Sequence, residues 1–214
     1  MDKSKEAANI FNKLASGYEE KFMNVDHYAS TLDFFCDSIK KQNASILELA
    51  CGPGNVTKFI LNKRPDLKLL GTDLAPNMIE LAKKNNPSAK FEIMDCRNID
   101  KLQQKFDGIL FAFGLPYLSK DEALKFISNA SKLLNQDGVL YLSTMEDENS
   151  RSEYKKGSTG DEIFMNFHEG TYLIKALEDC GFKILRLKRQ DFKNSDGTMA
   201  VDLIIVAQLS PLKH

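Results

Sequence analysis

The sequence predicts an α/β fold in which a mostly parallel sheet carries helices on both faces. From residue 45 onward, short apolar runs alternate with amphipathic helical patterns, which is typical of parallel βαβ units. A glycine-containing loop follows the first run, and acidic residues lie at the ends of the first three. Open α/β sheets bind ligands at the carboxyl ends of their strands, so this edge is the expected site. A chain of 214 residues with 43% hydrophobic content is long enough for one domain with a sizeable core.

Residues 1–43 are expected to form an N-terminal helical cap, and residues 44–214 the α/β core. Aromatic and aliphatic residues recur at helical spacing over residues 10–22. We expect Phe11 to pack in an apolar face. The Tyr18 hydroxyl needs a partner if it is buried, so this residue fits either a packed face or a pocket wall.

The loop after the first strand has the composition of a nucleotide-binding turn. Gly52 and Gly54 free the backbone for dihedral angles that a Cβ would penalise, and they let main-chain N–H groups approach a ligand. Thr57 occupies the third glycine position of the dinucleotide fingerprint. Glu48, just before the loop, would repel a pyrophosphate but suits a ligand that carries an amine or sulfonium.

Two further strands bring acids to the same edge. Strand 67–73 ends at Asp73, about twenty residues past the glycines, where a carboxylate can accept two hydrogen bonds from a ribose diol. Nicotinamide enzymes use the same device, and a surface aspartate after a strand is the simpler alternative. Strand 90–94 delivers Asp95. Helices are expected between these strands, at residues 56–63 and 76–85.

This ordered set resembles the motifs of class I S-adenosylmethionine-dependent methyltransferases, with Ala50 in the first glycine position of acid-x-G-x-G-x-G. The resemblance implies a Rossmann-like methyltransferase fold of seven strands, with only the last antiparallel. It implies that Asp95 accepts from the adenine amino group, that the N–H of Cys96 donates to the ring, and that Tyr18 lies near the methionine end. It also assigns Leu74, Met78 and Phe111 to the cofactor pocket.

The remaining elements follow the same alternation, and residues 145–168 are expected to form a substrate loop. Gly181 is expected to end the last helix as a C-terminal cap. The composition of residues 194–197 favours a hairpin turn. The expected elements are a strand at 107–113, a helix at 120–134, a turn at Asp137-Gly138 into a strand at 139–144, a helix at 169–180, and strands at 182–192 and 200–209.

The expected chemistry is an in-line displacement at a methyl carbon, for which the protein must hold both reactants and exclude water. If the acceptor must lose a proton, Tyr117 and His168 are the candidate bases. Tyr117 ends the segment 114–117, which matches only half of the signature of amino-group methylators. His168 precedes a helix, where a histidine can act as a base at neutral pH or simply cap the helix.

Composition restricts the partners. The 29 basic and 30 acidic residues leave no basic field to gather nucleic acid. The four cysteines are scattered, which fits free thiols in a reducing cytoplasm, and no cluster has metal-ligand spacing. No leader or membrane-spanning run is evident, so we expect a cytoplasmic protein.

The predicted function is S-adenosylmethionine-dependent methyl transfer to a small-molecule acceptor. Two alternatives remain open at this point. One is an NAD(P)-dependent oxidoreductase, which Thr57 and Glu48 disfavour. The other is a non-catalytic module that binds S-adenosylmethionine. The sequence carries no signature for the acceptor or for the oligomeric state.

Overall fold

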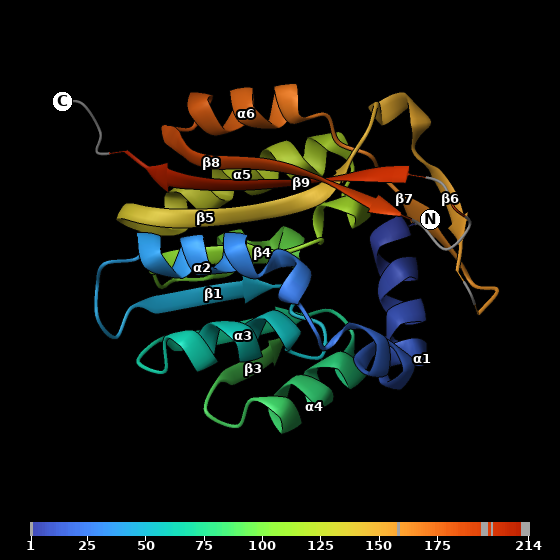
Figure 1. Ribbon diagram of the computed structural model, residues 1–214, viewed down its shortest axis with the longest axis horizontal. Helices are drawn as coiled ribbons and strands as arrows, with labels where there is room; N and C mark the ends of the chain where they lie inside the picture. The colour runs from blue at the N-terminus through green and yellow to red at the C-terminus, as the bar shows by residue number, and fades with distance from the viewer. Residues whose placement is uncertain (1, 158, 194–196, 198, 211–214) are drawn as a thin grey trace.

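A seven-stranded sheet forms the centre of the molecule (Figure 1). The computed structural model describes residues 2–157, 159–193, 197 and 199–210. In strand order β3-β2-β1-β4-β5-β9-β8, only β9 runs antiparallel to its neighbours, which confirms the expected mixed sheet. The strands are β1 Ser45–Leu49, β2 Lys68–Asp73, β3 Lys90–Ile93, β4 Phe106–Phe111, β5 Leu134–Glu146, β8 Phe182–Lys193 and β9 Met199–Leu209.

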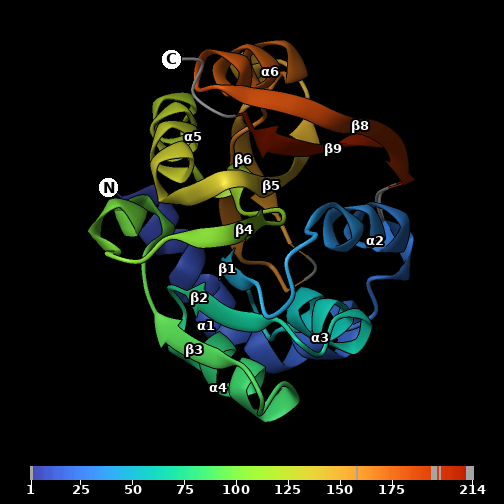
Figure 2. The same ribbon diagram turned by 90° about the vertical axis from the view of Figure 1, so that its left-hand side faces the viewer.

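Helices cover both faces of this sheet, as Figure 2 shows. Buried residues of α2 and α3 pack on one face, and those of α5 and α6 on the other. The α-helices are α1 Lys3–Phe22, α2 Ala29–Ser38, α3 Asn55–Lys63, α4 Pro76–Asn85, α5 Lys120–Leu133 and α6 Gly170–Asp179. The short 3-10 helices are η1 Asp26–Tyr28, η2 Cys96–Lys101, η3 Leu115–Tyr117 and η4 Asn149–Arg151.

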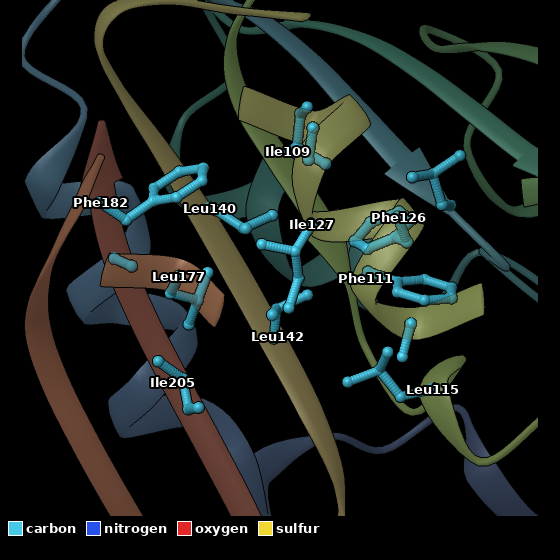
Figure 3. Packing of buried hydrophobic residues seen from close by; sticks show 14 of the residues in the cluster. Ile109, Phe111, Leu115, Phe126, Ile127, Leu140, Leu142, Leu177, Phe182 and Ile205 are labelled. Carbon is cyan, nitrogen blue, oxygen red and sulfur yellow. The ribbon is translucent and has the colours of Figure 1, made fainter. Parts of the chain in front are cut away.

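Strand periodicity explains why the central strands are apolar at nearly every position. Leu140 and Leu142 point to the α5–α6 face, whereas Tyr141 between them points to the α2–α3 face. Figure 3 shows the packing on the first face, where Leu142 and Ile127 lie together. Each fully buried leucine contributes about 1.5–3 kcal/mol relative to an exposed one.

The start of β5 differs from expectation, and part of the expected turn between β8 and β9 lies outside the described residues. β5 begins at Leu134, directly after α5, so Asp137-Gly138 is not a turn before the strand but an irregularity within it. Asp137 takes φ 60°, and the pairing with β4 shifts register there, as at a β-bulge. β8 and β9 pair as a hairpin up to Lys193 and Met199, while residues 194–196 and 198 of the expected turn lie outside the described residues.

The segment expected as a polar loop contains a separate two-stranded sheet, β6 (Glu153–Lys156) with β7 (Glu162–Met165). These four-residue strands are too short to give a clear periodic signal in the sequence. The small sheet packs beside α1, and an ion pair of 3.0 Å joins Lys13 of α1 to Asp161.

Helix α1 lies across the edge toward which β1 and β4 point (Figure 1). The Asp2 side chain caps its first turn by accepting from the N–H of Lys5. Within the described residues, no helix has the length and apolar character needed to cross a membrane.

Gly54 offers a test of how tightly the first loop is packed. It precedes α3 at φ 78°, and a Cβ there would lie 2.3 Å from Asn86 Nδ2 and 3.3 Å from Cα of Ala82. We expect Gly54→Ala to lower the free energy of unfolding by about 2–4 kcal/mol, because a left-handed alanine is strained and the buried Asn86 must move.

Gly160→Ala is the matched control. Gly160 has φ 87°, and a Cβ added there would meet no atom within 4 Å. This variant should lose only the ~1 kcal/mol that the left-handed conformation costs an alanine. Urea denaturation measures both variants, and equal losses would contradict the packing argument.

Candidate active site

The loop after β1 uses left-handed backbone at three alternating positions. Ala50, Gly52 and Gly54 have φ of 51°, 53° and 78°. A Cβ on Gly52 would approach the Tyr18 ring to 3.9 Å and would enter the space between loop and helix. Gly54 does not line that space. Its carbonyl accepts from Asn86 Nδ2 at 2.9 Å, so it positions α3 against α4.

Glu48 lies beneath this loop and does not line the cavity described below. Its side chain is 2% exposed, and it accepts from the Thr57 hydroxyl at 2.5 Å. Burial raises the pKa of Glu48 to about 8, although the bonds from Thr57 act to lower it. Thr57, at the missing glycine position, thus serves as the partner of the buried acid.

Asp73 ends β2 and fastens the loop. Its carboxylate accepts from the main-chain N–H of Gly52 at 2.9 Å and of Ala75 at 2.8 Å. Burial raises the pKa of Asp73, partly offset by these backbone hydrogen bonds. The carboxylate faces the cavity, where a diol could reach it.

Asp95, after β3, belongs to an ion network that ties α1 to the site. Burial acts to raise the pKa of Asp95, but the hydrogen bonds and charge of Arg97 prevail and lower it. Arg97 contacts Asp95 at 2.6 Å and also Asp2 at 2.8 Å and Glu122 at 3.1 Å. Asp95 lies two residues before Arg97, but Asp2 and Glu122 lie on distant parts of the chain, so spacing alone does not predict the network.

A cavity opens between α1 and these strand ends, with an empty volume of about 820 Å³ that includes solvent at its mouth. The structure brings together in it most of the residues that the sequence indicated. It is lined by Ser4, Ala7, Ala8, Phe11, Tyr18, Ala50, Gly52, Asp73, Leu74, Met78, Met94, Asp95, Cys96, Ala112, Phe113, Gly114, Tyr117 and Leu118.

Aromatic rings form the part of the cavity wall that α1 and η3 contribute. Phe11, expected in a packed face, lies edge-on to Tyr18 and Tyr117, with centroids 5.7 and 5.2 Å away. Burial raises the pKa of Tyr18 to about 12, helped by the charge of Asp73, and also raises the pKa of Tyr117. High pKa values keep both phenol hydroxyls protonated at neutral pH, so neither is ready to take a proton from an acceptor.

Phe113 was not indicated by the sequence, although it lines the cavity. It has φ 53°, which a bulky residue rarely adopts, and its N–H donates to the Ser143 hydroxyl at 3.0 Å. This turn ends β4 at Phe111, two residues before the expected end. Phe111 itself is fully buried against Phe126, with ring centroids 4.4 Å apart (Figure 3), and it does not line the cavity.

His168 also lies outside the cavity. It is fully buried, and its Nε2 is 2.9 Å from the Leu115 carbonyl, so Nε2 carries the proton and donates. Its Nδ1 then accepts from the Tyr172 hydroxyl. Burial lowers the pKa of His168. The ring therefore holds η3, which carries Tyr117, rather than facing the reactants.

We expect His168→Ala to lower the free energy of unfolding by roughly 2–4 kcal/mol, because the buried carbonyl and hydroxyl lose their partner. Tyr172→Phe removes only the Nδ1 partner and should cost about 1 kcal/mol. Chemical denaturation of both variants measures the difference. A stability unchanged by His168→Ala would show that the ring does not hold η3.

Among the described residues, no cluster of side chains has the make-up of a metal site, and all four cysteines are free. The charged residues of the cavity are the two acids, and the other lining groups are small, apolar or aromatic. Such a cavity can hold a ribose and an adenine at its acids and shield a second reactant under α1.

Comparison with known proteins agrees with this geometry. Residues 46–138 match a family described as a methyltransferase domain. Putative methyltransferase 235L of Invertebrate iridescent virus 6 is 30% identical over 118 residues, which are 51% of this chain and 44% of that protein. Malonyl-[acyl-carrier protein] O-methyltransferase of Acetivibrio thermocellus is 29% identical over 136 residues, 63% of this chain and 47% of that protein. The matched region thus spans about half the length of these curated relatives.

The fold is shared with solved structures. N-methyltransferase NodS from Bradyrhizobium japonicum WM9, in complex with S-adenosyl-L-homocysteine, superposes with a TM-score of 0.73 at 16% identity, over 98% of this chain and 100% of that one. The methyltransferase-domain match over residues 46–138 agrees with the resemblance that the strand-end acids and glycine loop indicated, and the superposition shows a shared fold.

Proposed function

We propose that this chain, with its class I S-adenosylmethionine-dependent methyltransferase domain, transfers a methyl group to a small-molecule acceptor bound under α1. The observation that carries the proposal is the single cavity surface shared by Gly52, Asp73 and Asp95 from three strand ends and by the α1 residues opposite them. The matched relatives extend well beyond the aligned region, so we infer the kind of acceptor from the residues of this chain.

The residues present fit the cofactor. Asp73 would accept from the ribose hydroxyls, and Asp95 and the N–H of Cys96 would hold the adenine edge. The absence of a Cβ at Gly52 keeps open the space beside Tyr18. Lining residues Ala50, Leu74 and Met78 would supply apolar contact. When bound, S-adenosyl-L-methionine supplies a methyl group activated by a sulfonium.

The protein's own contribution is to position and to exclude water. Helix α1 covers the cavity and is held there by Asp2 on Arg97 and by the Ser4 hydroxyl, which donates to the Tyr117 carbonyl at 2.6 Å. Holding two reactants in attack geometry can lower a barrier by ~7–11 kcal/mol. Glu48, beneath the loop, would favour a positively charged ligand above it.

A small acceptor is favoured because α1 covers the cavity. The wall opposite the strand ends comes from α1 of the same chain. The described lining residues include no Lys or Arg, so they form no basic groove for a polymer. The near-balanced charge of the sequence agrees with this proposal.

A thermal-shift panel with S-adenosylmethionine, S-adenosylhomocysteine, NAD and NADP tests the cofactor. A ligand at about 100 times its dissociation constant stabilises by ~2.7 kcal/mol, which is several degrees for a chain of this size. We expect shifts with the two adenosyl ligands only. A shift only with a nicotinamide would overturn the proposal, and binding with no transfer to a broad acceptor panel would indicate a non-catalytic module.

A further inference from the structure

We infer that the methyl acceptor is an amine on an apolar body, because the cavity walls from α1 and the β4–η3 segment are aromatic or aliphatic and carry no cation to hold an anion. This inference rests on the proposed methyl transfer and specifies the substrate class of the same cavity.

The aromatic side chains suit a cation as well as an apolar group. Tyr18, Phe11 and Tyr117 form one continuous edge-to-face cluster on the α1 side. Phe113, in the turn after β4, also lines the cavity, and its ring centroid lies 5.0 Å from that of Tyr28, which supports its position. Ring faces attract ammonium groups and give no favourable contact to carboxylates.

The charges around the cavity have one sign. Asp73 and Asp95 are its charged lining residues, and no Lys, Arg or His lines it within the described part of the chain. The guanidinium of Arg97 is engaged by Asp2, Asp95 and Glu122. A carboxylate or phosphate acceptor would therefore meet no counterion among the residues that line the cavity.

Tyr18 and Tyr117 both line the cavity, so their hydroxyls can reach a ligand. Two neutral donors do not offset the cost of burying an unpaired carboxylate. They suffice for an amine, which can donate to a phenol oxygen or accept from its hydroxyl.

The cavity also favours the reactive form of an amine. Burial raises the pKa values of Tyr18 and Asp73, which shows that negative charge is disfavoured here. Desolvation acts to lower the pKa of a bound ammonium, against the opposite effect of the two acids, and the neutral amine with its lone pair is the form that reacts. An amine therefore needs no base from the protein, in agreement with the position of His168 outside the cavity.

The step balances without a further reactant. The nitrogen lone pair forms a bond to the methyl carbon while the carbon–sulfur bond breaks, and its electron pair stays on sulfur. The sulfonium becomes the neutral thioether S-adenosylhomocysteine. The methylated nitrogen is left as an ammonium, which loses a proton to water.

Matched probes test the inference on protein saturated with S-adenosylhomocysteine. Each triplet of probes has one body and ends in an amine, an alcohol or a carboxylate. One triplet is tyramine, tyrosol and 4-hydroxyphenylacetate, and the others have phenethyl, indolyl-ethyl and octyl bodies. Calorimetric titration should rank amine above alcohol, and both above carboxylate by on the order of 100-fold. With S-adenosylmethionine, mass spectrometry should find methyl on nitrogen.

A charge-insertion variant sharpens the test. Ala8 lines the cavity, whereas Asn9, its neighbour on α1, is exposed and does not line it. Ala8→Arg should strengthen binding of the carboxylate probes and weaken that of the amines by roughly tenfold each, since it reverses the local charge. Asn9→Arg adds the same charge outside the cavity and should leave the ranking unchanged.

The outcomes separate the two proposals. Protein that fails to bind S-adenosylhomocysteine contradicts the proposed function. Protein that binds it but prefers carboxylates, or binds no member of any triplet, overturns the amine inference while the methyltransferase proposal stands.

Discussion

Asp73→Ala should weaken the binding of S-adenosylhomocysteine by roughly 10²–10³-fold. The proposed ribose contact consists of hydrogen bonds to a charged acceptor, each worth about 1.5–3 kcal/mol, and ~1.4 kcal/mol is tenfold in affinity. The same carboxylate fastens the loop through Gly52 and Ala75, so its removal also loosens the glycine turn. Isothermal titration of the purified variant measures the loss.

Asp73→Asn separates the two roles. Its amide oxygen can still accept from one main-chain N–H, whereas its NH₂ group cannot accept from the diol. We expect Asp73→Asn to lower the melting temperature less than Asp73→Ala does, because one of the two main-chain bonds is kept, and to lose most of the affinity. If both variants bind with unchanged affinity, Asp73 does not hold the ribose.

The fold could be predicted because its signals are local. The helix expected at residues 76–85 begins and ends where expected, and most other elements agree within two residues, because capping residues and apolar periodicity lie within each segment. Besides the unexpected strands β6 and β7, β5 is the exception. Its bulge at Asp137 depends on pairing with β4, and the sequence of the segment shows a turn pair rather than that partner.

The residues of the candidate site also divide into those that a local pattern predicts and those that depend on distant contacts. Asp73 and Asp95 follow from spacing along the chain, and both line the cavity. Arg97 and Phe113 depend on contacts with distant elements, so no local pattern indicated them. Phe111 stays out of the cavity for a different reason. Side chains alternate along β4, so that of Phe111 points toward α5, and the next residue, Ala112, lines the cavity.

We expect the ionisation of Glu48 to lower the stability of the folded protein and to favour cofactor binding. Its pKa is 4.5 as a free side chain and about 8 in the folded protein. Between these values the unfolded chain loses the proton while the folded chain keeps it. The Glu48 contribution to stability is therefore full below pH 4.5 and falls as pH rises to about 8, by up to about 5 kcal/mol.

Glu48→Gln removes this titration and keeps an oxygen to accept from Thr57. We expect the variant without cofactor to match the unmodified protein at pH 5 and to exceed it by several kcal/mol at pH 9. Urea denaturation across this range measures the difference. A gap that does not change with pH would show that Glu48 does not titrate in this window.

The same substitution should weaken the binding of S-adenosylmethionine, because the ionised Glu48 favours the positive charges of the ammonium and sulfonium groups. Below pH 8 the unmodified protein should release a proton as the cofactor binds, since the bound charge lowers the pKa of Glu48. Calorimetry in buffers of different ionisation enthalpy detects that proton, and Glu48→Gln should abolish its release. Proton release that persists in the variant would assign the titration to another group, with Asp73 the nearest candidate.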